Sequence, residues 1–418
     1  MAASAASVPR STCMSAHCTA GGHASMRGSI RAMTLPGTHV IVVGAGIVGA
    51  AVAWSLTRAG ARVTVLERAA AAATGATGRS AAGLRHQFSA PQNVRFSAYG
   101  ARRYARFEAE VGVDAGFRRV GYAFVVPDAA VEGWRRQAAT VRAHGGRVDL
   151  LAPQEAAVRW PWLDLSGVGL VSYGPDDGVL DPHAVTLGWL GAARAGGAVV
   201  RFEAEVTDLA PSAVGWRVHT AHGAPLTGDV VVNAAGPQAG RVAALAGASV
   251  PVVPSRRSVY VTTAVSGLTL PTPLTVDVAS GVWLRSEGER VIFGRSNPAE
   301  PPGENERVDW DWLEPTLELA LPRFPFLARA ELDRRACWAG HYEVTPDHLP
   351  LIGWDPALPG LLHAAGFSGH GVQHAPATGA AVTALVAGEP SPFDLTPFAP
   401  GRFAAGLRAS GDGEVAIV

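Results

Sequence analysis

Lysine is absent from this sequence of 418 residues, in which all 35 basic residues are arginine. A GC-rich genome is the simplest explanation, but the absence also removes the compact ammonium group that some enzymes place beside a reacting atom. The 35 acidic residues balance the arginines, so the formal net charge is zero. Such a chain has no general electrostatic attraction for nucleic acid or for an anionic membrane, and we expect neither as a partner.

Cysteine is also scarce, since the chain contains only Cys13, Cys18 and Cys337. These three, two of them near the N-terminus, do not make a disulfide framework, which favours a reducing, cytoplasmic location. No apolar run reaches the roughly 18 residues that a membrane-spanning helix needs, so we expect no transmembrane segment. The 13 histidines are dispersed without the spacing of a metal site, and we expect no bound metal.

The rest of the composition is that of a globular protein, because 48% of the residues are hydrophobic and 17% are charged. Residues 1–37 differ: they are rich in alanine, serine, glycine and arginine, and the first acidic residue is Glu67. This segment is similar in composition to an organelle transit peptide, but we favour an extended or misassigned start, with Met33 as the true beginning. In either case we expect residues 1–37 to be disordered and dispensable.

The first motif, between His39 and Glu67, has the pattern of a strand, a turn, a helix and a second strand. The apolar run Val40–Val43 predicts a buried parallel strand. A helix is expected over residues 50–59 and ends at Gly60, and a second strand then leads to Glu67. The turn between the first strand and the helix has the spacing G-x-G-x-x-G.

The three glycines of this turn, Gly44, Gly46 and Gly49, predict a site for a dinucleotide pyrophosphate. Gly44 permits the tight turn, Gly46 lets the backbone approach the phosphates, and Gly49 lets the helix pack against the strand. The helix N-terminus offers free N–H groups and a partial positive charge. Glu67 can accept hydrogen bonds from ribose hydroxyls, and its charge disfavours a 2′-phosphate. This motif alone does not distinguish NAD from FAD.

Later segments favour FAD. Small residues in 74–83 allow the backbone to lie close to a flat ligand. An apolar strand at 229–236 ends in Ala-Ala-Gly, and a strand expected over 200–206 can offer its backbone edge to adenine. Residues 361–388 predict a strand, a glycine-rich loop and a helix from about Gln373, whose N-terminus can stabilise negative charge on a reduced flavin.

Together these motifs resemble the D-amino-acid oxidase superfamily of FAD-dependent oxidoreductases, which includes glycine oxidase, sarcosine oxidases and dimethylglycine dehydrogenase. The residues that carry the resemblance are GAGIVG at 44–49 with Glu67, VNAAGP at 232–237, TPDHLPLIG at 345–353 and GFSGHG at 366–371. The segment SAAGLRHQFSAPQNV at 80–94 is most similar to the branch of the sarcosine oxidase β-subunit and dimethylglycine dehydrogenase. The resemblance extends over residues 38–395.

The resemblance implies a mixed α/β (α+β) fold with a Rossmann-like FAD-binding domain and a second, substrate-binding domain built on an antiparallel sheet. Short apolar strands at 257–263 and 282–294, separated by turn residues, support the antiparallel sheet. Ligands should bind between the domains. We expect an FAD-binding domain over 38–90, 150–250 and 335–395, a substrate domain over 91–149 and 251–334, and a C-terminal tail over 396–418.

By the same resemblance, FAD is contacted by the small residues of the motifs and by a few of their neighbours. The expected FAD-binding residues are Gly44, Ala45, Gly46, Ile47, Val48, Gly49, Glu67, Arg68, Ser80, Ala81, Gly83, Val206, Ala235, Gly236, Gly340, Gly366, Ser368, Gly369, His370, Gly371 and Val372. We expect FAD to be bound without a covalent bond. A dimethylglycine dehydrogenase-like histidine would stand at Ser80 and a monomeric sarcosine oxidase-like cysteine at Gly340, and Cys337 lies three residues too early.

Amine oxidation by FAD requires residues that hold the anionic end of the substrate, and it needs no nucleophile. Arg85, Arg256 and Arg257 are candidate anchors, because a guanidinium can bind a carboxylate bidentately, although each can equally be a structural or surface arginine. His370, in the glycine-rich loop, fits either a role at the flavin edge or a role in loop packing.

Tyr342 is a further candidate and marks a departure from part of the family. It stands where glycine oxidases and D-amino-acid oxidases resemble each other in carrying an arginine, which argues against simple D-amino acids as substrates. For His86, Gln87 and Tyr260, a structural role fits better than a role in the pocket. The catalytic candidates are Arg85, Arg257, Tyr342 and His370.

We therefore predict an FAD-dependent oxidoreductase that oxidises the C–N bond of a small amine or amino acid, such as sarcosine, dimethylglycine or proline, by hydride transfer to flavin N5. A flavoprotein that acts mainly as an assembly factor or electron-transfer subunit is the alternative, and an NAD-linked dehydrogenase is a third interpretation. Proteins similar to monomeric sarcosine oxidase place a lysine near the flavin for the reaction with O₂. Because this chain has only Arg257 and His370 as substitutes, we favour a dehydrogenase that uses another electron acceptor.

Overall fold

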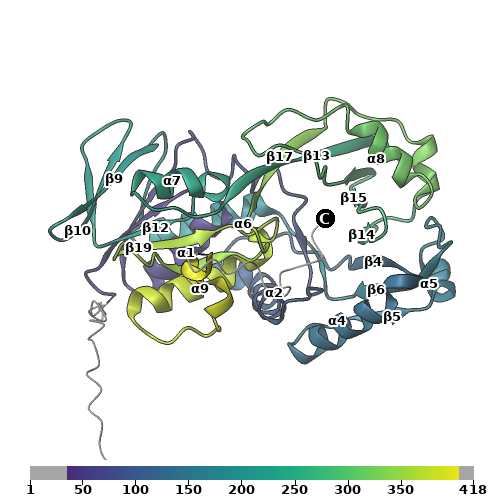
Figure 1. Cartoon of the computed structure of the whole chain (residues 1–418), viewed down its shortest axis with the longest axis horizontal. Helices are drawn as coiled ribbons and strands as arrows, with labels where there is room; N and C mark the ends of the chain where they lie inside the picture. Colours follow the sequence, from purple (N-terminus) through teal and green to yellow (C-terminus); the bar gives the residue numbers. More distant parts are fainter. Residues whose placement is uncertain (1–34, 404–418) are drawn as a thin grey trace, which may run out of the picture. The chain divides into compact units, whose positions relative to one another are not determined.

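The computed structural model describes residues 35–403 (Figure 1). The prediction that residues 1–37 are disordered and dispensable therefore lies outside the described residues, except for its last three positions. Of these, Leu35 packs against the hydrophobic core, and its carbonyl accepts a hydrogen bond from the N–H of Thr38. Residues 35–37 thus belong to the folded part of the chain.

The first sheet has six strands, of which five are parallel and one, β18, is antiparallel at an edge. The sequence of β1, HVIVV, is buried along its whole length, as expected for a parallel strand covered on both faces. Val42 of β1 pairs with Val232 on one side and with Val65 on the other. In spatial order the strands are β18 (Leu351–Trp354), β19 (Leu361–Ala365), β12 (Val230–Asn233), β1 (His39–Val43), β2 (Arg62–Leu66) and β8 (Val199–Arg201).

Three apolar helices pack together beside this sheet (Figure 1). They are α1 (Ile47–Arg58), α6 (Pro182–Ala195) and α9 (Gly371–Ala387). α1 contacts both of the others, which is why apolar residues occur on every side of it. α1 and α9 approach so closely that a Cβ atom on Gly379 would lie 2.8 Å from the carbonyl oxygen of Ala51.

A fourth helix, α2 (Pro91–Tyr104), packs against α9 and compensates for a proline inside it. Pro376 has no N–H, so the carbonyl of Val372 lacks its usual partner within the helix. The hydroxyl of Tyr104 donates a hydrogen bond to this carbonyl instead. A buried carbonyl is thereby satisfied at the start of α9, where the helix meets the candidate site.

The second sheet has eight strands and is antiparallel except where β14 pairs with β4. β15 and β16 form a hairpin around Gly288, which has a φ of +60°. A parallel sheet together with a mostly antiparallel sheet confirms the predicted fold class. In spatial order the strands are β17 (Trp338–Val344), β13 (Val253–Ala264), β16 (Arg290–Gly294), β15 (Trp283–Glu287), β14 (Leu274–Asp277), β4 (Tyr122–Pro127), β6 (Val168–Gly174) and β5 (Asp149–Leu151).

Three strands belong to a different sheet from the one predicted for their segments. The sequence assigns residues 150–250 and 335–395 to the FAD-binding domain, yet β5 and β6 pair beside β4, and β17 pairs with β13. The difference has a physical reason: the partner of an apolar strand is determined by contacts with residues far along the chain, which local sequence does not specify. The predicted domain bounds stay a prediction. The reverse holds for α2. It lies in the segment predicted for the substrate domain, 91–149, but packs on α9, which lies in a segment predicted for the FAD-binding domain.

Shorter elements complete the described part of the chain, in which no helix is both long and apolar enough to cross a membrane. A three-stranded antiparallel sheet lies beyond β12, and β3 pairs with β7. The elements are β9 (Val206–Ser212), β10 (Gly215–Thr220), β11 (Leu226–Gly228), β3 (Gly83–Leu84), β7 (Gly178–Val179), α3 (Phe107–Val111), α4 (Val131–Ala143), α5 (Pro153–Arg159), α7 (Ala239–Leu245) and α8 (Leu313–Ala320).

The first part of the predicted C-terminal tail, residues 396–418, packs against the fold. Phe398 is fully buried, and the guanidinium of Arg402 donates hydrogen bonds of 2.8 and 2.9 Å to the two carboxylate oxygens of Asp347. Residues 396–403 are therefore part of the packed structure. The remainder of the tail lies outside the described residues.

Candidate functional site

A cavity of about 420 Å³ lies at the carboxyl ends of β1, β2 and β12 and extends to the eight-stranded sheet. This volume is typical of small-molecule sites. Gly44, Glu67 and Ala234 line it on the side of the parallel sheet, and Tyr122 and Trp283 line it on the side of the second sheet. Ligands of open α/β sheets bind in this position, outside the carboxyl ends of the strands.

The glycine turn that follows β1 forms one wall of the cavity. Gly44 has a φ of +107°, and a Cβ atom there would lie 2.4 Å from the carbonyl oxygen of Ala234. Gly46 differs, because a Cβ placed on it would meet, among the described residues beyond its chain neighbours, only Thr77 Oγ1, at 3.2 Å. Gly44 is thus required by the close approach of two backbones, and Gly46 keeps open the space in front of α1.

Glu67, the residue that follows β2, is held in a defined orientation. Its Oε2 accepts a hydrogen bond of 2.8 Å from the N–H of Ala45, and its Oε1 accepts one of 2.9 Å from the N–H of Ala69. The carboxylate lines the cavity and retains further lone pairs for ligand hydroxyls. This arrangement is the one expected for binding a ribose.

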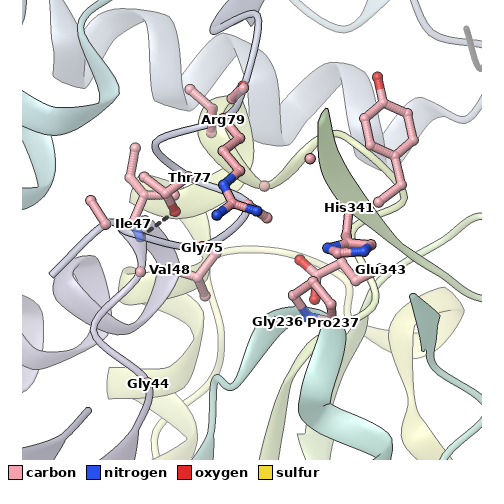
Figure 2. Close-up of a pocket in the computed structure, with 18 of the residues that line it drawn as sticks. Gly44, Ile47, Val48, Gly75, Thr77, Arg79, Gly236, Pro237, His341 and Glu343 are labelled. Atoms are coloured by element: carbon pink, nitrogen blue, oxygen red, sulfur yellow. Dashed lines mark hydrogen bonds between the residues drawn. The ribbon is translucent and has the colours of Figure 1, made fainter. Parts of the chain in front are cut away.

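Two side chains at the start of α1 were not predicted, Thr77 and Arg79. Thr77 Oγ1 accepts a hydrogen bond of 3.0 Å from the N–H of Ile47, in the first turn of α1. Figure 2 shows the Arg79 guanidinium beside Thr77, extending into the cavity towards His341. Arg79 is also paired with Glu306 at 2.7 Å. A guanidinium at a helix N-terminus adds positive charge where a diphosphate would bind.

Glu343, on β17, is a further residue that the sequence did not single out. Figure 2 places it beside His341, across the cavity from the turn at Gly44. Its Oε2 accepts a hydrogen bond of 2.9 Å from the N–H of Gly366, in the loop before α9. Burial raises the pKa of Glu343 from its ordinary value of 4.5 to about 7, although hydrogen bonds from Gly366 and Phe367 oppose this rise. The loop before α9 is therefore hydrogen-bonded to a carboxyl group that is protonated more readily than an ordinary glutamate.

Most of the predicted FAD-binding residues line this one cavity. Those that do are Gly44, Gly46, Ile47, Val48, Glu67, Arg68, Ser80, Ala81, Gly83, Val206, Ala235, Gly236, Gly340, Gly369, His370, Gly371 and Val372. They come from segments far apart in the sequence, and the fold brings them together as the motifs require. Their contact with FAD stays a prediction.

Four predicted FAD-binding residues do not line the cavity: Ala45, Gly49, Gly366 and Ser368. A Cβ atom on Gly49 would lie 2.0 Å from the carbonyl oxygen of Gly44, so this glycine permits the packing of α1 on the turn. The N–H groups of Ala45 and Gly366 are bonded to the carboxylates described above. Ser368 is fully buried. These residues shape the turn and the loop behind the cavity surface.

Arg85 and His370 form a buried pair on the cavity wall near the second sheet. Arg85 is 3% exposed, and its Nη2 lies 3.3 Å from His370 Nε2. The Arg85 guanidinium also stacks on Phe88, with its Cζ 4.3 Å from the ring centre. Burial, and then the charge of Arg85, hold the pKa of His370 well below its usual range. His370 is therefore neutral, with Nε2 as the acceptor and the proton on Nδ1.

Arg257 and Tyr342 lie on the neighbouring strands β13 and β17 and both line the cavity. The Arg257 guanidinium stacks on Tyr342, with its Cζ 4.8 Å from the ring centre. Its Nη1 donates hydrogen bonds to Ser255 Oγ and to the carbonyl of Arg256. Burial lowers the pKa of Arg257 and raises that of Tyr342, so the phenol is neutral.

The other substrate candidates lie outside the cavity and have structural partners. Arg256 is paired with Glu300 and Asp309, each at 2.9 Å, and Tyr260 donates to the carbonyl of Asp309. His86 and Gln87 are hydrogen-bonded to Asp177. Cys337 Sγ donates to the carbonyl of Asp333 and does not line the cavity. The structural interpretation of these residues is therefore the better one.

Three observations show that the cavity is suited to bind a dinucleotide. A Cβ atom on Gly46 would enter the space in front of α1, the carboxylate of Glu67 is fixed at the end of β2, and the first residues of α1 and α9 both line the wall. This site, between a parallel and a mostly antiparallel sheet, defines a nucleotide-dependent oxidoreductase of the flavoprotein class. The chain belongs to the DAO family of FAD-dependent oxidoreductases, whose family model matches residues 39–385.

Three similar proteins span nearly the whole described chain. FAD-dependent oxidoreductase domain-containing protein 1 of Bos taurus is 31% identical, over 89% of this chain and 86% of that protein. Mitochondrial dimethylglycine dehydrogenase of Mus musculus is 29% identical over 87% of this chain, which spans 44% of that longer protein. The crystal structure of L-proline dehydrogenase from P. horikoshii has a TM-score of 0.82 and 29% identity, and it covers 89% of this chain and 99% of its own.

Proposed function

We propose that this FAD-dependent oxidoreductase oxidises the C–N bond of a small amine or amino acid that carries a carboxylate. The observation that carries the proposal is the buried Arg85–His370 pair on the cavity wall. Two similar proteins are named for the dehydrogenation of dimethylglycine and of L-proline, both of which are amino acids with a substituted nitrogen. The missing arginine at Tyr342 agrees with this preference over simple D-amino acids.

Arg85 is suited to bind the substrate carboxylate. Its guanidinium is almost fully buried, and a charge-assisted hydrogen bond is stronger where water is excluded. The backbone N–H of Arg85 donates to Gln373 Oε1 at 2.7 Å, which fixes the segment that follows β3 to the first turn of α9. Within the described part of the chain, His370 Nδ1 is buried and has no hydrogen-bond partner, so it can donate to a ligand oxygen.

The same residues favour the neutral form of the substrate amine. Arg85 and Arg257 both line the cavity, and two cations disfavour an ammonium group placed near them. Tyr122 and Tyr342 are neutral phenols there, because burial raises the pKa of each. The apolar side chain of Leu274 also lines the cavity and helps to exclude water from it. When bound, FAD supplies the acceptor for the hydride that leaves the substrate carbon as the C–N bond becomes C=N.

The test is anaerobic bleaching of the purified yellow protein by sarcosine, dimethylglycine, proline and D-amino acids. We expect at least one amino acid with a substituted nitrogen to reduce the flavin, and D-amino acids to leave it oxidised. Arg85→Gln should raise the concentration needed for half-maximal reduction by about 30-fold or more. Arg136→Gln, on the exposed face of α4, is the matched control. If neither a compound of this panel nor an N-carboxyalkyl amino acid such as iminodiacetate reduces the flavin, the proposal is wrong and a role in assembly or electron transfer is favoured.

We also propose that FAD is bound without a covalent bond. Ser80 and Gly340 line the cavity where related proteins carry a histidine or a cysteine, and neither can form such a bond to the flavin. Cys337 is engaged with β13 and Asp333. Acid denaturation followed by filtration should release all of the yellow colour. Colour retained on the polypeptide, with a matching increase in its mass, would contradict the proposal.

A further inference from the structure

Some arginines that line the cavity form an ion pair with a carboxylate of the chain, and others, within the described residues, do not. Arg79 and Arg241 are paired with Glu306 and Glu205 at 2.7 and 2.8 Å. Arg257 lines the same cavity and forms no ion pair with any carboxylate of residues 35–403. A mostly buried guanidinium without a counter-ion is costly, and a bound anion would offset this cost.

The side chain of Arg257 is held in place with part of its donor capacity unused. Ser255 Oγ and the carbonyl of Arg256 accept from Nη1, at 2.7 and 2.8 Å, and the planar group rests on the Tyr342 ring. Nε of Arg257 is buried and has no hydrogen-bond partner in the described structure. Burial lowers the pKa of this arginine, although Tyr342 and the carboxylate of Glu300, which forms no ion pair with it, act in the opposite direction. The guanidinium is therefore oriented in advance for an anion.

Arg257 lies in the part of the cavity near Arg85 and Tyr342. Both arginines act electrostatically on the phenol of Tyr342, so both lie close to it. A Cβ atom on Gly369, in the loop before α9, would lie 2.5 Å from the Tyr342 ring. At the start of α1, where a diphosphate would bind, Arg79 supplies the positive charge instead. The free charge of Arg257 is thus available to the substrate.

We propose that the substrate is an amine with two carboxylates, in which Arg85 binds the carboxylate beside the oxidised carbon and Arg257 binds the second. Compounds of this class are N-carboxyalkyl amino acids, such as iminodiacetate, and N-alkyl derivatives of acidic amino acids. The inference rests on the proposed function, because it assigns the substrate class of the same site. Arg257 is accordingly a residue that determines specificity, and two guanidiniums close to the same Tyr342 ring match two carboxylates on one ligand.

Equilibrium binding of two thioethers tests this assignment without turnover. Thiodiacetate has two carboxylates and (methylthio)acetate has one, and both carry sulfur in place of the amine nitrogen. Binding is measured as the change in the flavin absorption spectrum of the purified, FAD-loaded protein. We expect thiodiacetate to bind at least about 10-fold more tightly than (methylthio)acetate. The inference is wrong if the two bind equally or if the monocarboxylate binds more tightly.

Variants then separate the two anchors. Arg257→Gln should weaken thiodiacetate binding by about 30-fold or more and change (methylthio)acetate binding by less than about 2-fold. Arg85→Gln should weaken both, and Arg136→Gln neither. If Arg257→Gln purifies without flavin, the binding of the two thioethers is measured on Arg257→Lys instead, because lysine keeps the charge but cannot bind a carboxylate bidentately. An equal loss of both ligands in the Arg257 variant would overturn the assignment.

Flavin bleaching by amines and thiodiacetate binding test the reaction and the second anchor separately. If sarcosine or proline bleaches the flavin as readily as iminodiacetate, amine oxidation stands and the second anchor is rejected. If no amine bleaches the flavin but thiodiacetate binds through Arg257, the dicarboxylate site stands and the proposed reaction is rejected.

Discussion

Gly46 is the residue whose side chain bears most directly on the cofactor. Gly46 lines the cavity, and a Cβ atom on it would meet, among the described residues beyond its chain neighbours, only Thr77 Oγ1 within 4 Å. We expect Gly46→Val to purify without flavin, because its branched side chain would occupy the space of the diphosphate. The flavin absorption band and the circular dichroism spectrum are measured on the same sample. A folded variant with a full flavin band would contradict the prediction. Gly191→Val, at an exposed and open position of α6, is the control.

Glu343 should make the stability of the protein depend on pH. Its pKa is raised by burial from 4.5 to about 7 in the folded chain, so unfolding between these values releases a proton. The stabilising effect of the bound proton is complete below pH 4.5 and is lost as the pH rises to about 7. The total is on the order of 3 kcal/mol. Glutamine keeps the shape of the neutral carboxyl and cannot lose a proton.

We therefore expect Glu343→Gln to gain stability relative to the natural chain as the pH rises from 4.5 to 8. Urea unfolding at several pH values in this range measures the difference in the free energy of unfolding. Glu289→Gln, at an exposed position between β15 and β16, controls for the loss of one negative charge. A difference for Glu343→Gln that does not change with pH would show that the carboxyl has an ordinary pKa.

At the scale of elements, the close packing of α9 on α1 positions the loop that borders the cavity. A Cβ atom on Gly379 would lie 2.6 Å from Ser55 Oγ and 2.8 Å from the carbonyl oxygen of Ala51. Gly379→Ala should therefore push the helices apart and lower the free energy of unfolding by about 1–3 kcal/mol, despite the better helix propensity of alanine. Flavin content should fall as well, because the first residues of α9 line the cavity.

Gly191→Ala in α6 is the matched control, because within residues 35–403 no atom outside its chain neighbours and its own helix backbone lies within 4 Å of the added methyl group. We expect it to be neutral or to stabilise by up to about 1 kcal/mol. Thermal and urea unfolding of both variants measure the contrast. Equal stability of Gly379→Ala and the natural chain would mean that the two helices can separate without cost.

The elements that the sequence predicts well are those with local signals. The expected helix over residues 50–59 is α1, which begins earlier, at Ile47, and the helix expected from about Gln373 is α9, which begins at Gly371. In both cases glycine-rich turns mark the start. Strand partners have no such signal: β17 leads directly into the flavin motif at 345–353 yet pairs with β13, and β6 pairs with β4. Hydrogen bonds between distant strands depend on the packing of the whole fold.

At the scale of the whole molecule, the cavity combines residues that motifs can predict with others that they cannot. Glycines and Glu67 follow from a spacing whose physical roles are known. Glu343 does not, because its raised pKa depends on burial under a loop that begins at Gly366. Arg79 lies in the recognised small-residue segment, but only the fold directs its guanidinium to the start of α1. A cytoplasmic location stays a prediction from the cysteine count.

The absence of lysine bears on the reaction of the whole protein with O₂. This reaction develops negative charge on oxygen, so a compact positive charge held near the flavin accelerates it. His370, one expected substitute, is neutral because burial and Arg85 lower its pKa. Arg257 remains, but its charge is spread over a planar group that rests on Tyr342. We therefore expect slow oxidation by O₂ and fast transfer to another acceptor.

Stopped-flow mixing of photoreduced protein with air-saturated buffer measures the rate of reoxidation. We expect reoxidation by O₂ to take minutes, and reoxidation by a quinone or a redox dye to be much faster. Arg257→Lys places a compact ammonium on the cavity wall, so it should speed the reaction with O₂ if charge compactness is the limiting factor. Arg136→Lys, far from the cavity lining, should leave the rate unchanged. Reoxidation of the natural protein within a fraction of a second would instead make it an oxidase. It would also show that arginine can replace the missing lysine.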